Sequence, residues 1–190
     1  SMYDRFVQVH LDNTDFAHGV PSFLPWHRKF TRDFELALQR IDPTVSVPYW
    51  DWSLDSQAPE QSPIFGADMF GGNGQGEDNC VMDGKFANWV LAVPERRCLQ
   101  RSFNERAEIS ALYPPESLLS IQREEITYED FWYALEGPPH GVVHMGIGGD
   151  MASMTSPNDP LFWVHHSFID KLWSDWQIAR PNTRLTMYGG

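Results

Sequence analysis

Histidine is the residue whose positions carry the most chemical information in this chain. The seven histidines fall into an early and a late group: His10, His18, His27, His140, His144, His165 and His166. None occurs in residues 28–139, which make up more than half of the 190-residue chain. A single histidine is more often a packed or surface residue than a ligand, but two such tight groups favour a metal site.

The spacing of the histidines predicts two sites with three imidazoles each. His140 and His144 stand four residues apart, so on a helix both rings project from one face and can share an ion. His166 adds a third imidazole, and the early group supplies another three. An all-imidazole set suits copper, zinc, nickel or iron and disfavours magnesium and calcium. No histidine here has glutamate three residues before it, the pattern of carboxylate-bridged di-iron sites, so we predict a pair of copper ions.

The elements that must position these side chains are predicted to be mainly α-helical. Helical spacing of apolar residues or helix-start signals occur in residues 1–10, 26–41, 127–136, just after 139, and 161–178. Residues 53–125 show little periodicity apart from a helical turn around 115–122. The expected architecture is therefore a helical bundle with long irregular loops, and bundles commonly hold dinuclear sites in their interior.

Several residues mark where the predicted helices begin and end. Pro25 places residues 11–26 in an irregular connection that precedes the helix of residues 26–41. Thr127 is a candidate N-cap, and either Asn158 or Asp159 can cap the last helix. The run Gly-Pro-Pro at 137–139 should stop one helix and allow another to start directly after it.

Composition limits the class of protein. Hydrophobic residues make up 42% of the chain and charged residues 21%, which is typical of a globular domain, and the length allows one domain over residues 1–190. The formal net charge of −12 argues against binding nucleic acid or an anionic membrane surface. No apolar run approaches the ~20 residues of a membrane span, and the chain does not begin with a basic and then apolar leader.

The two cysteines lie in the histidine-free middle of the chain. Cys80 and Cys98 have no CxxC spacing and no nearby histidine, so zinc-finger or thioredoxin chemistry is not indicated. Two interpretations remain open: two free thiols, or one disulfide closing a loop in a Gly- and Asp-rich segment. We favour the disulfide, which would imply an oxidising compartment and therefore secretion.

Four motifs resemble those of the tyrosinase and polyphenol-oxidase family of coupled dicopper proteins. They are AHGVPSFLPWHR (17–28), PYWDW (48–52), HGVVH (140–144) and SPNDPLFWVHHSFID (156–170). The resemblance implies a four-helix bundle carrying two copper ions. It also implies that His10, His18 and His27 hold one copper and that the other is held by His140, His144 and His166. His165 would then be a neighbour of the second site and not a ligand.

The resemblance also gives roles to residues near the metals. Glu136 is similar to a family glutamate that orders a water near the second copper, although an exposed residue at a helix end is the alternative. Asp170 could orient a ligand or pair with Arg28. Met151, Ser153 and Met154 occupy a loop that lies over the substrate entrance in the family, but irregular-loop bulk explains them equally well. The aromatic residues of the motifs, Trp26, Trp50, Trp52, Phe162 and Trp163, are expected to be core and not substrate contacts.

The implied activity is oxidation of small o-diphenols to o-quinones with dioxygen, with monophenols or o-aminophenols as further candidate substrates. Gly141 stands where several phenol-hydroxylating members have asparagine, so we expect catechol oxidation in preference to monophenol hydroxylation. Phe16 replaces the cysteine that forms a thioether in many members. The alternatives are an oxygen carrier of haemocyanin type with the same six ligands, and a hydrolytic dizinc site. Because the chain starts nine residues before His10, we expect it to be a catalytic core of a longer protein.

Overall fold

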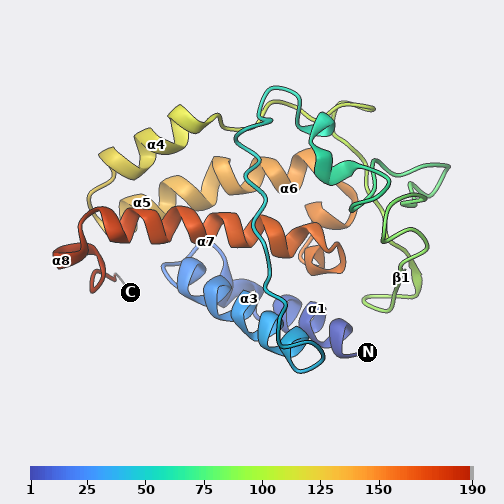
Figure 1. The fold of residues 1–190 in the computed structure, drawn as a ribbon, viewed down its shortest axis with the longest axis horizontal. Helices are drawn as coiled ribbons and strands as arrows, with labels where there is room; N and C mark the ends of the chain where they lie inside the picture. Colours follow the sequence, from blue (N-terminus) through green and yellow to red (C-terminus); the bar gives the residue numbers. More distant parts are fainter. Residues whose placement is uncertain (189–190) are drawn as a thin grey trace.

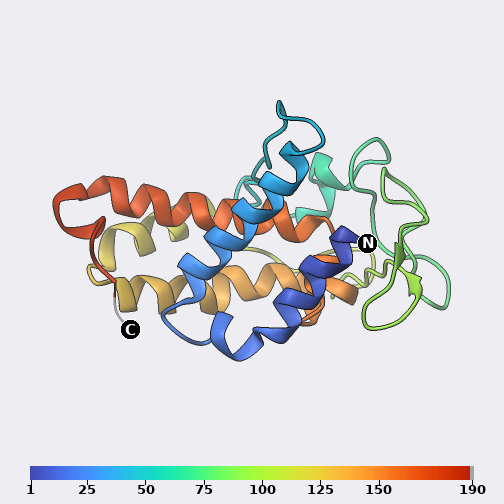
Figure 2. The ribbon, with the colours of Figure 1, turned by 90° about the horizontal axis from the view of Figure 1, so that it is seen from below.

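Four long helical segments form the bundle that the sequence predicts. The computed structural model describes residues 1–188, in which the bundle consists of α1 (Met2–Asp12), α3 (Phe23–Gln39), α5 (Tyr128–Leu135) continuing into α6 (Gly141–Ile147), and α7 (Leu161–Ala179). In Figure 1, α7 runs through the middle, with α1 and α3 on one side of it and α5 and α6 on the other. Figure 2 shows α3 lying obliquely across α7. None of the helices in residues 1–188 is long and apolar enough to span a membrane.

Two helices differ from the sequence-based expectation. Helix α3 starts at Phe23, three residues before the predicted start, because Pro25 lies in its first turn, where a backbone N–H would have no intrahelical acceptor anyway. The predicted helical turn around 115–122 is the ten-residue helix α4 (Pro115–Glu124). This helix packs on α7, where the Gln122 side chain donates to the Leu172 carbonyl at 3.0 Å.

The connection between α5 and α6 is a kinked helical run. Thr127 caps α5 as predicted, because its hydroxyl accepts the N–H of Asp130 at 3.1 Å. After α5 the chain makes a π-helical turn (Glu136–His140) in which Gly137 has a non-helical ψ of −114°. Proline at 138 and 139 supplies no N–H for a regular helix, so the first helix stops and α6 begins directly after His140.

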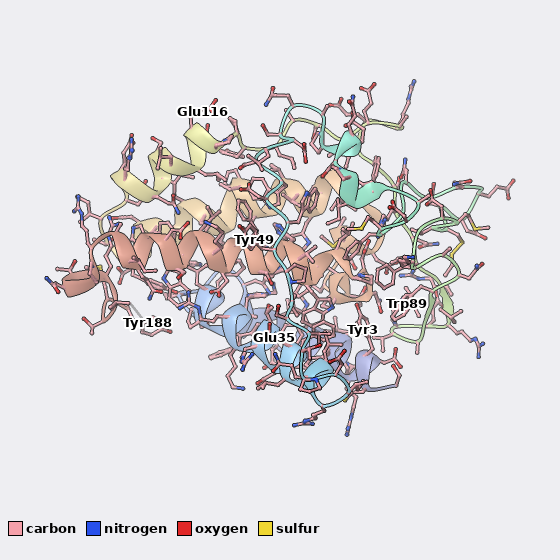
Figure 3. The ribbon with its side chains drawn as sticks, in the orientation of Figure 1. Tyr3, Glu35, Tyr49, Trp89, Glu116 and Tyr188 are labelled. Atoms are coloured by element: carbon pink, nitrogen blue, oxygen red, sulfur yellow. A yellow bond between two sulfur atoms is a disulfide. The ribbon has the colours of Figure 1, made fainter. Side chains whose placement is uncertain are left out.

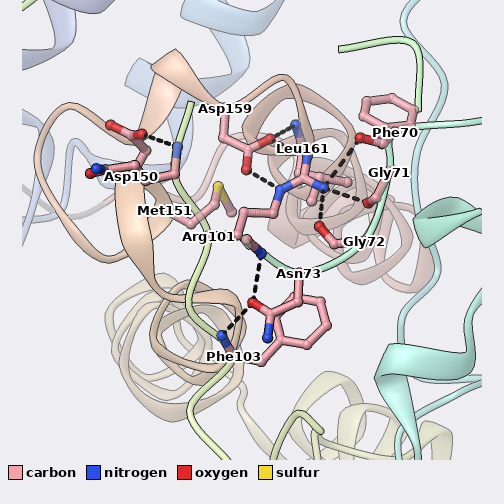
Figure 4. Close-up of polar contacts among 12 residues, drawn as sticks. Phe70, Gly71, Gly72, Asn73, Arg101, Phe103, Asp150, Met151, Asp159 and Leu161 are labelled. Atoms are coloured by element: carbon pink, nitrogen blue, oxygen red, sulfur yellow. Dashed lines mark hydrogen bonds and ion pairs between the residues drawn. The ribbon is translucent and has the colours of Figure 1, made fainter. Parts of the chain in front are cut away.

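The start of α7 is fixed by a fully buried ion pair. Of the two predicted capping candidates, Asp159 accepts the N–H of Leu161 at 2.9 Å. The same carboxylate accepts two hydrogen bonds from the Arg101 guanidinium, at 2.7 and 2.9 Å, and both side chains are 0% exposed. Arg101 also donates to the carbonyl oxygens of residues 70–72, as Figure 4 shows. One arginine thus joins two loop segments to the helix that carries His165 and His166.

The long segment between α3 and α4 contains only short elements. These are η1 (Pro59–Gln61), η2 (Pro63–Phe65) and an antiparallel pair of strands, β1 (Val90–Leu91) and β2 (Arg97–Cys98). Cys80 and Cys98 form the predicted disulfide, with Cα atoms 5.6 Å apart. A small separate core of Val81, Leu91 and Leu99 supports this region.

Aromatic side chains fill the bundle on the side of α1. Phe34 and Trp163 stack with ring centroids 3.8 Å apart, and Tyr3 accepts the indole N–H of Trp163 at 3.0 Å. Tyr3 also lies against Trp89 from the loop region, at 5.2 Å between centroids, and Figure 3 labels both residues. Of the motif aromatics expected in the core, Trp50, Trp52, Phe162 and Trp163 are buried and Trp26 is partly buried, whereas Tyr49 of the same motifs is exposed.

Removing the disulfide is expected to destabilise the fold without changing its architecture. In the chain-entropy description, a cross-link around a loop of this length contributes about 3 kcal/mol to the free energy of unfolding. A Cys80→Ala/Cys98→Ala variant should therefore unfold at a lower urea concentration than the unchanged chain. Reducing the disulfide of the unchanged chain should abolish the difference between the two urea midpoints of unfolding. Equal urea midpoints for the variant and the unchanged chain before reduction would contradict the prediction.

Candidate metal centre

The early histidines converge at one point of the bundle. His10 lies in the last turn of α1, His18 follows the short helix α2 (Thr14–Ala17), and His27 lies in α3. Each offers a ring nitrogen, and these three atoms lie within 4.8 Å of one another. His10 and His27 are buried, and His18 is partly exposed. The geometry can hold one metal ion among three imidazoles.

Backbone carbonyl groups orient the rings of this first group. His10 Nδ1 lies 2.8 Å from the Met154 carbonyl oxygen, and His27 Nδ1 lies 2.9 Å from that of Phe23. His18 Nδ1 has the same kind of contact, 3.1 Å from the Thr14 carbonyl oxygen. A carbonyl oxygen only accepts, so each Nδ1 carries the proton and each Nε2 keeps a free lone pair. This pattern fixes ring orientation at metal sites.

The late histidines form a second group with four members. His140, His144, His165 and His166 place their ligand nitrogens within 4.8 Å of one another. His140 Nδ1 lies 3.0 Å from the Glu136 carbonyl oxygen, and His144 Nδ1 lies 2.7 Å from that of Met151. The sequence predicts three ligands here, whereas the structure brings His165 within the same distance.

The two groups lie side by side in the core. The rings of His27 and His166 stack at 4.3 Å between centroids with an interplanar angle of 11°. Phe23 packs against His27 and His140, with ring centroids 4.7 and 4.9 Å away. Two distant stretches of the chain therefore build a single dinuclear cradle.

Burial keeps these imidazoles neutral. Loss of solvent is the largest cause, and it lowers the pKa of His10 to about 3 and that of His144 to about 4. Burial, reinforced by the neighbouring imidazoles, holds the pKa of His27, His140 and His166 well below 6.5. Neutral imidazole is the form that binds a metal ion, so the site needs no deprotonation at neutral pH.

The donor set fits the copper pair that the sequence resemblance implies. Three ring nitrogens in the second group, His140 Nε2, His165 Nε2 and His166 Nδ1, are buried without a hydrogen-bond partner in the described residues. An unpaired buried polar atom costs about 1–3 kcal/mol. A bound ion removes that cost at a nitrogen with a free lone pair, such as His140 Nε2, and imidazole is a good ligand for copper.

A cavity of about 170 Å³ opens beside both groups. It is lined by His10, His18, His140, Gly141, His144, Met145, Met151, Ala152, Ser153, Met154 and Ser156. The sequence predicted Gly141 and the loop residues Met151, Ser153 and Met154 near the metals. It missed Met145, Ala152 and Ser156, although the adjacency of Met145 to His144 was a visible signal. Met145 and Met154 are exposed, so the cavity is open to solvent between them.

Glu136 is hydrogen-bonded to the residue that follows His18 and to the ring of His140. Its Oε1 accepts the backbone N–H of Gly19, next to His18, at 2.6 Å, and its Oε2 accepts the indole N–H of Trp132. Its backbone carbonyl orients His140. Partial burial raises the pKa of the carboxyl, opposed by these two hydrogen bonds. Glu136 therefore stands at the C-terminal end of α5, as the alternative has it, but it is partly buried and not exposed.

Asp170 and Arg28 form an ion pair between α7 and α3, the second of the two roles that the sequence left open. The Arg28 guanidinium lies over the ring of Trp173 at 3.7 Å and donates to the Gln177 side chain at 3.0 Å. Burial raises the pKa of Asp170, and the positive charge of Arg28 opposes that shift. The pair holds together the two helices that carry His27 and His166.

Known proteins with this sequence pattern share the fold. A family model described as the common central domain of tyrosinase matches residues 1–179. The chain is 40% identical to the tyrosinase of Streptomyces antibioticus, covering 99% of this chain and 77% of that protein, and 39% identical to that of Streptomyces glaucescens, covering 95% and 74%. The structure of a polyphenol oxidase variant from Thermothelomyces thermophila matches with a TM-score of 0.78 at 30% identity, covering 93% of this chain and 59% of that chain. With its two histidine groups in one bundle, the chain belongs to the tyrosinase family of dicopper oxidoreductases.

Proposed function

We propose that this chain oxidises o-diphenols to o-quinones with dioxygen. His10, His18 and His27 would hold one copper ion, and His140, His144 and His166 the other. The observation that carries the proposal is the cavity beside two neutral imidazole groups, because substrate can reach both ions there. Monophenols and o-aminophenols are further candidate substrates of the same site.

The cavity favours one small aromatic ring. An apolar cavity of about 150 Å³ binds benzene in another protein, and the cavity here has about 170 Å³. When bound, the copper pair supplies dioxygen binding and the acceptance of two electrons from each catechol. Two catechols and one dioxygen give two o-quinones and two waters, so each catechol also releases two protons. The chain must orient the ring and accept those protons.

Glu136 is the proposed proton acceptor, acting through a water. Its carboxylate is held in place by the backbone N–H of Gly19, which directly follows His18, and by the indole N–H of Trp132. A positioned general base contributes about 10²–10⁴ to a rate.

Glu136→Gln is therefore expected to lower kcat for catechol by about a hundredfold while both copper ions stay bound. The matched control is Glu129→Gln, an exposed position in the first turn of α5, which should leave kcat unchanged. Steady-state kinetics and copper analysis on the same samples test this. Full activity of Glu136→Gln, or its loss of copper, would reject the catalytic role.

The substrate class is tested by assaying catechol and tyrosine in parallel on copper-loaded protein. Gly141 lines the cavity and brings no side chain that could hold a water or a phenol, so quinone is expected from catechol and not from tyrosine. Fast hydroxylation of tyrosine would reject that selectivity. Bound dioxygen with no turnover of either compound would favour the oxygen carrier. Zinc in the protein as purified, before copper is added, would favour the hydrolytic site.

We also propose that residues 1–190 form one tyrosinase-like domain that works in an oxidising compartment, consistent with a secreted protein. The family model spans nearly all of the chain, which supports one domain. The disulfide supports the compartment, since disulfides persist where thiols are not kept reduced.

A further inference from the structure

The second histidine group contains one imidazole more than the first. Its four ligand nitrogens all lie within 4.8 Å of one another, so distance alone does not select three of them. A site with four protein ligands would be closed, whereas three leave a position for chemistry. Something other than distance must therefore keep one imidazole from the metal ion.

Trp52 supplies that selection through a hydrogen bond to His165. Its indole Nε1 donates to His165 Nδ1 at 3.1 Å. An indole nitrogen can only donate, so His165 Nδ1 must be the unprotonated nitrogen. An imidazole that is unprotonated on Nδ1 carries its proton on Nε2. A protonated Nε2 has no lone pair for a metal ion.

Two of the three imidazoles near His165 have the opposite proton arrangement. The Nδ1 atoms of His140 and His144 face backbone carbonyl oxygens, which leaves their Nε2 atoms unprotonated. His165 stacks on His140 at 5.3 Å between centroids, so it lies beside a ligand in space but differs from it in the position of its proton.

The donor is held rigidly at this place. Trp52 and His165 are both 0% exposed, so no solvent competes for the hydrogen bond. The Trp52 ring packs edge-on against Phe168 of α7 at 5.1 Å. Two residues earlier, the backbone N–H of Trp50 donates to the Val164 carbonyl at 2.9 Å, which ties this loop to α7 one residue before His165.

We propose that Trp52 is a positioning residue that keeps His165 out of the coordination sphere of the second copper and so preserves an open position there. The inference rests on the proposed function, because that function names His140, His144 and His166 as the ligands. The sequence indicated only that Trp52 belongs to the core, since its partner lies 113 positions away.

Trp52→Phe tests the proposal against a matched control, Trp50→Phe. Trp50 is also a buried tryptophan of the same segment, but its indole N–H donates to the Ser62 hydroxyl at 3.2 Å and not to a histidine. Proton–nitrogen correlation NMR on the full chain loaded with copper(I), which is diamagnetic, reports which ring nitrogen of each histidine is protonated.

In the unchanged chain and in Trp50→Phe, His165 should be protonated on Nε2. In Trp52→Phe the proton should move to Nδ1, and Nε2 should show the shift of a copper-bound nitrogen. Azide should also bind the oxidised copper form of Trp52→Phe about tenfold more weakly, because the fourth imidazole occupies the open position.

Two outcomes would overturn the proposal. One is a proton on His165 Nδ1 in the unchanged chain, a result that stands even if Trp52→Phe fails to fold. The other is a folded Trp52→Phe in which the proton stays on Nε2 and azide affinity is unchanged. A chain that does not oxidise catechol but shows the expected proton pattern would reject the proposed function and leave the role of Trp52 intact.

Discussion

Replacement of His27 by alanine is expected to remove one of the two copper ions and to lower catechol oxidation by more than about a hundredfold. Loss of a residue that merely orients a metal ligand costs about 10–100-fold in metal affinity or activity, and loss of a ligand should cost more. His27 is also the ring that meets the second group, stacked on His166 at 4.3 Å. Copper analysis per chain and steady-state kinetics measure the two effects.

His165→Phe is the matched control for that experiment. It removes an imidazole from the same cradle, but one that accepts a hydrogen bond from Trp52 and that we propose is not a ligand. Two copper ions per chain should therefore remain bound. Circular dichroism of both variants tests whether the helical bundle is intact. Retention of two copper ions in folded His27→Ala would contradict the assignment of His27 as a ligand.

Arg101→Met is expected to lower the free energy of unfolding by about 3–5 kcal/mol, because it leaves the carboxylate of a buried ion pair without its partner. Asp159 and Arg101 are both 0% exposed, and Asp159 also accepts the N–H of Leu161 at the start of α7. Removing the arginine in addition frees the three carbonyl oxygens that it bonds in the loop of residues 70–72. Urea unfolding of the variant and of the unchanged chain measures this difference in the free energy of unfolding.

Lys171→Met serves as the control for the buried pair. Lys171 and Asp175 form an ion pair on the exposed side of the same helix, and such pairs contribute about 0–1 kcal/mol. Adding Asp159→Asn to Arg101→Met should recover part of the lost stability, since the unpaired charge is then absent. A change of less than about 1 kcal/mol in Arg101→Met would show that the buried pair does not hold the helix start.

Residue type and local spacing predicted most of the bundle helices and the two histidine groups. His140 and His144 stand at helical spacing, and Thr127 precedes a recognisable helix, so these features depend on neighbours in the sequence. Pro25 misled the prediction because the same residue type both breaks a helix and fits its first turn.

Ion pairs and hydrogen bonds between residues far apart in the sequence could not be predicted from the sequence. Arg101 forms an ion pair with Asp159, and Arg97 with Asp150, while Trp52 donates a hydrogen bond to His165. In each pair the two residues lie more than fifty positions apart in the sequence. A single sequence offers many charged and aromatic residues, and nothing local indicates which two will meet. The fourth imidazole of the second group was visible as His165, but its hydrogen bond to Trp52 forms only in the folded chain.

The loop of residues 151–154 at the edge of the cavity orients one histidine in each of the two groups. The carbonyl oxygen of Met154 orients His10, and that of Met151, three residues earlier, orients His144. Any molecule that pushes this short loop aside therefore tilts one ring at each ion simultaneously. A substrate too large for the cavity should therefore disturb the ligand geometry of both metal sites together, before any electron is transferred.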